Sequence, residues 1–214
     1  MPRSARRVDD EGIYHLLNRG NGQQRVFQKD RDYQAFLELL GQMLDKFDIV
    51  LFAYCLMPNH FHLLVKAQKG ENLSRGMQWF MTTHVRRYHR HYQSSGHLWQ
   101  GRYKSFGIQD NDHFLTVARY VEGNPVRAGL VDTAADWVWS SHRGRSLGLA
   151  PQVPVPFSPQ VPVPLEPLVT PLPVPFTGDW TNFVNMPMTP TEMAKARKLI
   201  ARQKGKSEGE QLIH

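Results

Sequence analysis

Apolar residues alternate with polar ones, or run without interruption, in four short stretches that predict β-strands. The predicted strands cover residues 13–17, 49–57, 60–66 and 98–109. Asn18-Arg19-Gly20-Asn21-Gly22 is a turn signal after the first strand, and Pro58-Asn59 separates the second strand from the third. The second and third strands are therefore expected to form a hairpin.

Between and after these strands, apolar residues recur three and four positions apart, which is the spacing of one helix face. Asp30 and Asn72 are expected to cap the first two helices, and either Asn111 or Asp112 is expected to open the third. Pro125 disfavours helix in the residue before it, so the third helix should stop near Asn124.

The predicted order is strand, helix, strand, strand, helix, strand, helix. Two split βαβ halves joined by a hairpin give an α+β, ferredoxin-like βαββαβ fold, with an antiparallel sheet and its first two helices on one face. The first and third strands in sequence would then be central. The added third helix can cross the open face of the sheet or its edge.

The C-terminal third changes character. Ten of the fifteen prolines lie in residues 151–176, which predicts an extended linker. Thr189-Pro190-Thr191-Glu192 has capping-box spacing and predicts a helix that carries Lys195, Arg197, Lys198, Arg202 and Lys204. We therefore divide the chain into a core domain at 1–148, which ends after the segment Trp139-Ser140-Ser141, a proline-rich linker at 149–178 and a basic tail at 179–214.

Composition favours a nucleic-acid partner. The 214 residues carry a formal net charge of +7, a balance typical of proteins that contact nucleic acid or an anionic membrane. No apolar run reaches the ~18 residues that a membrane span needs, and the N-terminus lacks the apolar core of a signal peptide. Cys55 is the single cysteine, so we expect no disulfide framework and a cytoplasmic, nucleoid-associated protein without membrane contact.

His60 and His62 are one residue apart on a predicted strand, where alternate side chains share a face. Two imidazoles on one rigid strand can form half of a metal site, although a pair of surface histidines on an amphipathic strand would have the same spacing. Tyr120 and Asn124 are four apart and share a face of the third helix. The Asn124 amide oxygen suits a hard cation such as Mg²⁺ or Mn²⁺, whereas Tyr120 taken alone is compatible with a packing role.

Several motifs occur together in one order: Tyr14-His15, Arg19-Gly20-Asn21, Met57 to His62, Gly96 to Ser105, Arg119-Tyr120-Val121-Glu122, and Asn124 to Leu130. In this order they resemble the REP-associated tyrosine transposases. These are single-tyrosine members of the HUH endonuclease superfamily, related to insertion-sequence transposases that move single-stranded DNA. The resemblance covers about residues 8–145, and the proline-rich stretch is not part of it.

This resemblance implies an enzyme that cuts and rejoins single-stranded DNA beside short palindromic repeats folded into hairpins, as a monomer or a homodimer. It implies that His60 and His62 are metal ligands, that Tyr120 is the nucleophile and that Asn124 is a third ligand for Mg²⁺ or Mn²⁺. The nucleophile would form a 5′-phosphotyrosine intermediate. Candidate DNA contacts are Arg19, Arg102, Lys104 and Arg127.

Two other functional hypotheses compete with that of a DNA-cutting enzyme. A ferredoxin-like sheet can bind single-stranded DNA or RNA hairpins without cutting them, as a domesticated transposase would. A zinc-dependent hydrolase built on His60 and His62 fits less well, because the chain lacks the HExxH spacing and an obvious carboxylate base.

Overall fold

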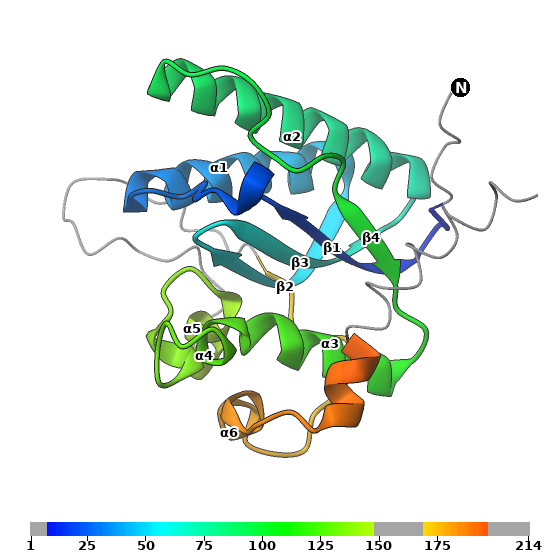
Figure 1. Ribbon diagram of the computed structural model, residues 1–214. Helices are drawn as coiled ribbons and strands as arrows, with labels where there is room; N and C mark the ends of the chain where they lie inside the picture. The colour runs from blue at the N-terminus through cyan, green and yellow to red at the C-terminus, as the bar shows by residue number, and fades with distance from the viewer. Residues whose placement is uncertain (1–7, 148–168, 197–214) are drawn as a thin grey trace, which may run out of the picture.

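The computed structural model describes residues 8–147 and 169–196, in which helices cover both faces of one antiparallel sheet (Figure 1). The strands are β1 (Ile13–Arg19), β2 (Ile49–Met57), β3 (His60–Ala67) and β4 (Lys104–Gly107), in the order β2-β3-β1-β4. The α+β, ferredoxin-like arrangement is thus confirmed, and β1 and β3 are the central pair as predicted.

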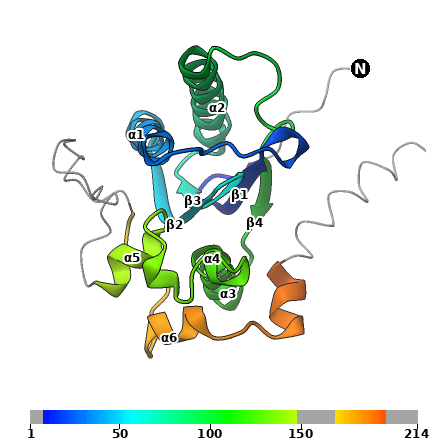
Figure 2. The ribbon, with the colours of Figure 1, turned by 60° about the vertical axis from the view of Figure 1, so that its left-hand side comes forward.

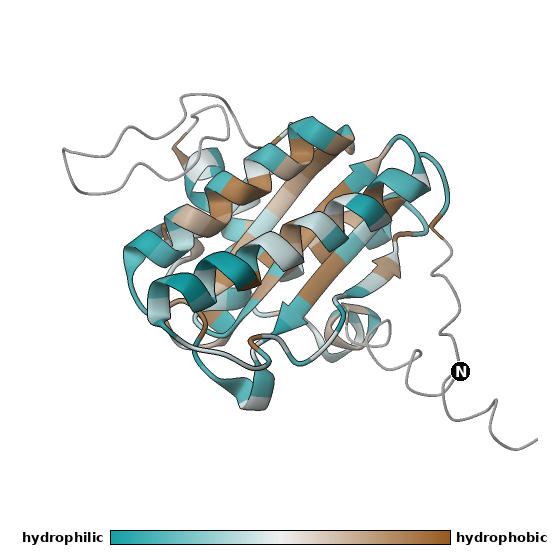
Figure 3. Cartoon of the chain, turned by 90° about the horizontal axis from the view of Figure 1, so that it is seen from above, coloured by the Kyte–Doolittle hydropathy of each residue, from teal (hydrophilic) through white to brown (hydrophobic). Residues whose placement is uncertain are grey.

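The helices α1 (Asp30–Phe47) and α2 (Gly70–Tyr92) lie side by side on one face of the sheet (Figures 2 and 3). Their apolar faces bury Phe61, Leu63 and Val65 of β3, which point away from His60 and His62 as the alternation of a strand requires. This side of the sheet holds the larger core, which includes Phe36, Phe80 and Trp99.

The helix α3 (Asn111–Glu122) crosses the opposite face, and α4 (Asn124–Arg127) continues from it. Phe114, Val117 and Val121 of α3 pack on Cys55 and Leu64 of the sheet in a second core. The N-cap of α3 is Asp110, whose carboxylate accepts from the His113 N–H at 2.8 Å, so the helix begins at the predicted position. Of the two predicted positions for the third helix, the open face and the edge of the sheet, the helix therefore occupies the open face.

The break between α3 and α4 occurs at Gly123, two residues before Pro125. Gly123 keeps a nearly helical backbone, with φ −84° and ψ 5°. A Cβ at this position would lie 3.0 Å from the Val184 carbonyl oxygen, so a side chain would push away the segment that packs there. Asn124 consequently stays close to the line of α3, and Pro125 occupies the first turn of α4, where it needs no hydrogen bond.

Three predicted boundaries were wrong. The second helix begins at Gly70 rather than after Asn72, and Lys69 is its N-cap. The first helix includes Asp30, and Asp32 accepts from the backbone N–H groups of Gln28 and Lys29 in place of the expected cap.

The fourth strand covers 104–107 and not 98–109. Gly101 has a φ of 150°, which breaks the extended run, and Trp99 forms only an isolated bridge with Gly20. Trp99 and Tyr103 are instead buried in the core, and this burial explains the apolar signal that suggested a longer strand.

The segments after α4 close the domain. They contain the 3-10 turn η2 (Ala134–Asp136), α5 (Ser141–Ser146) and α6 (Trp180–Asn185). Another 3-10 turn, η1 (Asn21–Gln23), follows β1. As predicted, the Trp139 segment packs on the sheet, because the Trp139 carbonyl accepts from the Leu56 N–H at 2.9 Å. Within residues 8–147 and 169–196, every helix is too short or too polar to cross a lipid bilayer.

Residues 169–196 also contact the core. The Thr170 N–H donates to the Leu51 carbonyl at 2.7 Å, and Glu192 forms a 2.7 Å ion pair with the buried Arg119 of α3. The Thr189–Glu192 capping box is present, and residues 190–196 are helical. Residues 148–168 of the predicted linker and the later basic positions of the tail lie outside the described residues, so the division at 148 and 178 stays a prediction.

Candidate functional site

A cavity of about 780 Å³ lies between the sheet and the C-terminal end of α3. All eight site residues predicted from the sequence line it: His60, His62, Tyr120, Asn124, Arg19, Arg102, Lys104 and Arg127. These residues come from three strands, two helices and one loop, so the fold gathers positions that are up to 108 residues apart (19 to 127).

Strand register explains the imidazole pair. His60 is paired with Arg19 and Met57, and His62 with Leu17 and Cys55, across the two neighbouring strands. Cross-strand partners share a face of the sheet, and this is the face that α3 covers. The ring centroids of His60 and His62 are 5.0 Å apart, with the ring planes almost perpendicular.

Tyr120 approaches these histidines from α3, which covers their face of the sheet. Its ring centroid lies 5.7 Å from that of His62 and 6.2 Å from that of His15, edge to face in both cases. Asn124, one helical turn later, lines the same cavity, and its amide nitrogen is buried without a hydrogen-bond partner. The phenol and the amide therefore converge on the cavity that the histidines face.

Hydrogen bonds orient both histidines. Nδ1 of His60 donates to the Asn59 amide oxygen at 2.7 Å, because that oxygen can only accept. Nδ1 of His62 bonds to Nε2 of His15 at 2.9 Å. The neutral His60 ring consequently carries its lone pair on Nε2, and His62 does the same when its Nδ1 holds the proton.

Burial keeps these rings neutral. It lowers the pKa of His60 to about 4, with a smaller contribution from the positive charge of Arg19. Burial also lowers the pKa of His62 well below its usual value, and the neighbouring His15 and His60 act in the same direction. A neutral imidazole has a lone pair to donate, which is the form that binds a cation.

His15 is the residue that the sequence prediction missed. Its side chain is buried, and its pKa falls to about 3 through burial and the charge of His113. His15 is paired with Leu64 and so lies diagonally across from His62 on the same face. The Tyr14-His15 motif marked this position in the sequence, but only the register of β1 against β3 shows that His15 contacts His62.

Arg127 contacts Tyr120 directly. Its guanidinium donates to the Tyr120 carbonyl oxygen and lies over the Tyr120 ring, 4.5 Å from the centroid. This predicted DNA contact therefore also fixes the phenol ring. Arg19, Arg102 and Lys104 are exposed at the rim of the cavity, and Met193 of the C-terminal segment lines it as well.

Buried neutral histidines make the stability depend on pH. His15 and His84 have pKa values of about 3 and 4 in the folded protein, and that of His62 is also lowered, mainly by burial in each case. Below pH 6.5 the unfolded chain binds protons that the folded chain does not, so acidification favours unfolding.

We expect the free energy of unfolding to fall between pH 7.5 and pH 5.5 by up to about 1.4 kcal/mol per pH unit for each such histidine. Urea titrations at several pH values measure this slope. His84→Leu should reduce the slope by the contribution of one histidine, because the unfolded variant binds one proton fewer. Equal stability across the range would contradict the prediction.

The chain is similar to known transposases in sequence. The family model described as "Transposase IS200 like" matches residues 10–124. A Haemophilus influenzae protein named as a REP-associated tyrosine transposase is 26% identical over 134 residues, which cover 56% of this chain and 76% of that protein.

One solved structure shares the fold. The structure of a REP-associated tyrosine transposase bound to a REP hairpin superposes with a TM-score of 0.55 at 18% identity, covering 79% of this chain and all of that one. A transposase from Deinococcus radiodurans matches more weakly, with a TM-score of 0.39 at 19% identity over 52% of this chain and 88% of its own. The family match spans more than half of the sequence, and this chain is a member of the IS200-like transposase family.

Proposed function

We propose that this protein is a metal-dependent endonuclease and transposase that cuts single-stranded DNA beside palindromic hairpins and rejoins it through a 5′-phosphotyrosine intermediate. The observation that carries the proposal is the convergence of His60, His62, Tyr120 and Asn124 on one cavity with a basic rim. The hairpin is the ligand of the structural relative, and we extend it to this chain on the shared family.

The donor set suits a divalent cation. His60 and His62 are neutral and have Nδ1 engaged, so Nε2 of each is the atom that would bind the ion. Asn124 would add its amide oxygen, and its amide nitrogen has no hydrogen bond within the described residues that would hold the amide in another orientation. No cluster of three or more His, Cys, Asp or Glu ligands occurs among residues 8–147 and 169–196, which favours this mixed set over a zinc site.

When bound, Mg²⁺ or Mn²⁺ would polarise the phosphate and neutralise charge that develops on it. Tyr120 Oη attacks the phosphorus, the bond between phosphorus and the 3′ oxygen breaks, and the phenol proton is transferred in balance to that oxygen. The 5′ end is then joined to Tyr120, and a free 3′ hydroxyl remains. A 3′ hydroxyl from another strand reverses the step, so rejoining needs no nucleotide cofactor.

The chain's own residues prepare this attack. Arg127 holds the Tyr120 ring and carbonyl, which limits the rotamers of the phenol. Arg19, Arg102 and Lys104 supply positive charge at the rim for the phosphates of the strand.

His15 is expected to orient His62 toward the cation. Replacing it by phenylalanine keeps the ring and removes the nitrogen that bonds to Nδ1 of His62, so His15→Phe should lower Mn²⁺ affinity by about 10- to 100-fold. Isothermal titration with Mn²⁺ measures this directly. Phe106→Leu is the control, since Phe106 also packs on the His15 ring, at 6.1 Å, but offers no polar atom. Equal affinities in the two variants would remove His15 from this role.

Covalent capture tests the proposed function. The protein is incubated with Mn²⁺ and end-labelled single-stranded DNA that carries the palindrome beside its own gene, and is then denatured. We expect label that stays on the protein, and peptide mapping should locate it at Tyr120. Tight binding of the same strand with no protein-linked label at any metal concentration would replace this proposal with that of a non-cutting hairpin binder.

A further inference from the structure

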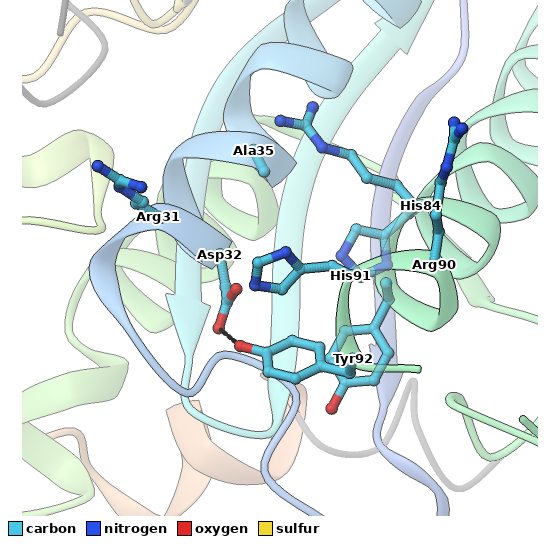
Figure 4. A pocket seen from close by; sticks show the side chains of 9 residues that line it. Arg31, Asp32, Ala35, His84, Arg90, His91 and Tyr92 are labelled. Carbon is cyan, nitrogen blue, oxygen red and sulfur yellow. Dashed lines mark hydrogen bonds between the residues drawn. The ribbon is translucent and has the colours of Figure 1, made fainter. Parts of the chain in front are cut away.

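A second cavity, of about 480 Å³, lies between the N-terminal end of α1 and the C-terminal end of α2 (Figure 4). We call it the helix-end pocket. Its lining includes Arg31, His84, Tyr88, Arg90, His91 and Tyr92. It is on the face of the sheet away from Tyr120, and the proposed chemistry does not use it.

The two cavities nevertheless share one end of the molecule. The start of α1 and the finish of α2 lie at the same end of the sheet as the β2–β3 turn and α4 (Figure 1). The loops between the cavities are bonded together there. The Val26 and Phe27 N–H groups donate to the Pro58 carbonyl, and the Gln100 N–H donates to the Arg19 carbonyl at 2.8 Å. A strand that occupies both cavities would therefore have to run around this end, over these loops.

Positive charge surrounds the helix-end pocket. Arg31 and Arg90 stand on opposite sides of it in Figure 4, and neither guanidinium has an ion-pair or hydrogen-bond partner among the described residues. The carboxylate at the pocket, on Asp32, already accepts from the Tyr92 hydroxyl at 2.7 Å and from two backbone N–H groups. The pocket therefore offers unpaired cations to an anion, and its one acid is already bonded.

Aromatic surface accompanies the charge. The rings of Tyr88 and Tyr92 lie 4.6 Å apart, and Lys29 Nζ is 5.3 Å from the Tyr92 centroid. Tyr88 is half-buried, so part of its ring remains open to a flat ligand. Phosphate-binding arginines beside a stacking ring are the features that hold a single strand without reading its sequence.

A buried polar atom also points to a ligand. His84 is 5% exposed, and its Nδ1 has no hydrogen-bond partner. It lines the floor of the pocket between aromatic core residues and His91. An unsatisfied buried nitrogen costs free energy unless a ligand or water bonds to it, and a nucleobase edge supplies both donors and acceptors.

We propose that the helix-end pocket binds an unpaired nucleotide of the same DNA strand that the Tyr120 cavity cuts. Arg31 and Arg90 contact the flanking phosphates, the base stacks on Tyr88, and His84 bonds to the edge of the base. This inference rests on the proposed function for its ligand class. It adds a recognition site that is separate from the chemistry.

Charge reversal separates recognition from cutting. The double variant Arg31→Glu/Arg90→Glu is compared with Arg75→Glu/Arg86→Glu, which places the same charge change at exposed α2 positions outside the pocket. On a long single strand that contains the hairpin, the first variant should bind about tenfold or more weakly than the second, and its salt dependence should lose roughly 1.4 units of slope, from two phosphate contacts at about 0.7 each. On a short strand that reaches only the Tyr120 cavity, both variants should cut at the rate of the unchanged protein.

A base analogue locates the nucleotide. With 2-aminopurine at successive positions of the long strand, one position should be quenched by the unchanged protein and recover in Tyr88→Leu. Equal binding by the two charge variants, or quenching that does not respond to Tyr88→Leu, would overturn the proposal. Binding and quenching are read without cleavage, so absence of an adduct would count against the proposed function and leave this result intact.

Discussion

Tyr120→Phe should form no covalent DNA adduct and leave no cut strand, while binding to the same single strand stays close to that of the unchanged protein. The substitution deletes only the hydroxyl oxygen that would attack phosphorus. The ring remains to pack against His62 and under Arg127. Loss of a nucleophile typically reduces turnover by roughly 10³-fold or more, so label on the protein should vanish from a denaturing gel.

A second tyrosine-to-phenylalanine variant serves as the control for this experiment. Tyr33→Phe also removes one phenol oxygen, from a buried ring that stacks on Trp139 at 4.6 Å and is outside the Tyr120 cavity. It should form the adduct as the unchanged protein does. An adduct that persists in Tyr120→Phe would show that another group attacks the DNA and would remove Tyr120 from the proposed role.

The strand and helix periodicities were enough to predict which side chains face the Tyr120 cavity. The alternation of a strand placed His60 and His62 on one face and Phe61, Leu63 and Val65 on the other, and the register of β3 agrees. Helical spacing placed Tyr120 and Asn124 together, and Gly123 preserves that spacing across the break before α4. These predictions rest on local geometry, which a single sequence encodes directly.

Features that depend on tertiary contact were not predictable in this way. The burial of Trp99 and Tyr103 imitates a strand because a buried loop and a buried strand share the same apolar composition. The bond between His15 and His62 joins residues 47 positions apart and depends on how β1 is registered against β3. The salt bridge from Arg119 to Glu192 spans 73 positions, across the proline-rich stretch that suggested a separate tail.

Glu122 is the clearest case of a role that no local pattern shows. It follows Tyr120 by two residues and is fully buried. Its carboxylate accepts from Ser141 Oγ at 2.6 Å, Trp180 Nε1 at 2.7 Å, Arg145 Nε at 2.8 Å and His142 Nδ1 at 3.1 Å. These donors come from the α5 segment and from α6, so one side chain fastens α3 to both.

The carboxylate stays charged in this position. Burial raises its pKa, but the hydrogen bond from His142 and the positive charge of Arg145 outweigh burial and hold the pKa at about 2. A lowered pKa of this kind stabilises the fold above pH 4.5, and the stabilisation is lost as the pH falls toward 2. Within the physiological range, Glu122 is therefore an ionised side chain whose two oxygens accept four hydrogen bonds.

Glu122→Ala should reduce the free energy of unfolding by about 3–5 kcal/mol, because it removes the charge that balances the partly buried Arg145 guanidinium and leaves the ring N–H groups of His142 and Trp180 without their acceptor. For a chain of this size, that loss corresponds to a melting temperature lower by roughly 10 °C. Glu38→Ala is the control, since its ion pair with Arg87 is exposed at both ends and is worth less than about 1 kcal/mol. Thermal and urea unfolding compare the two variants.

The same variants connect stability to the site. Because Glu122 holds the end of α3 that presents Tyr120, the Glu122→Ala protein that remains folded at low temperature should form the covalent adduct more slowly than Glu38→Ala. Glu122→Gln keeps one acceptor oxygen, which can serve either Ser141 and Arg145 or Trp180 and His142, and this variant should fall between the two in both measurements. If Glu122→Ala unfolds at the same urea concentration as Glu38→Ala, the four hydrogen bonds at Glu122 do not fasten α3 as argued, and the placement of Tyr120 must depend on Arg127 and the apolar face of α3 alone.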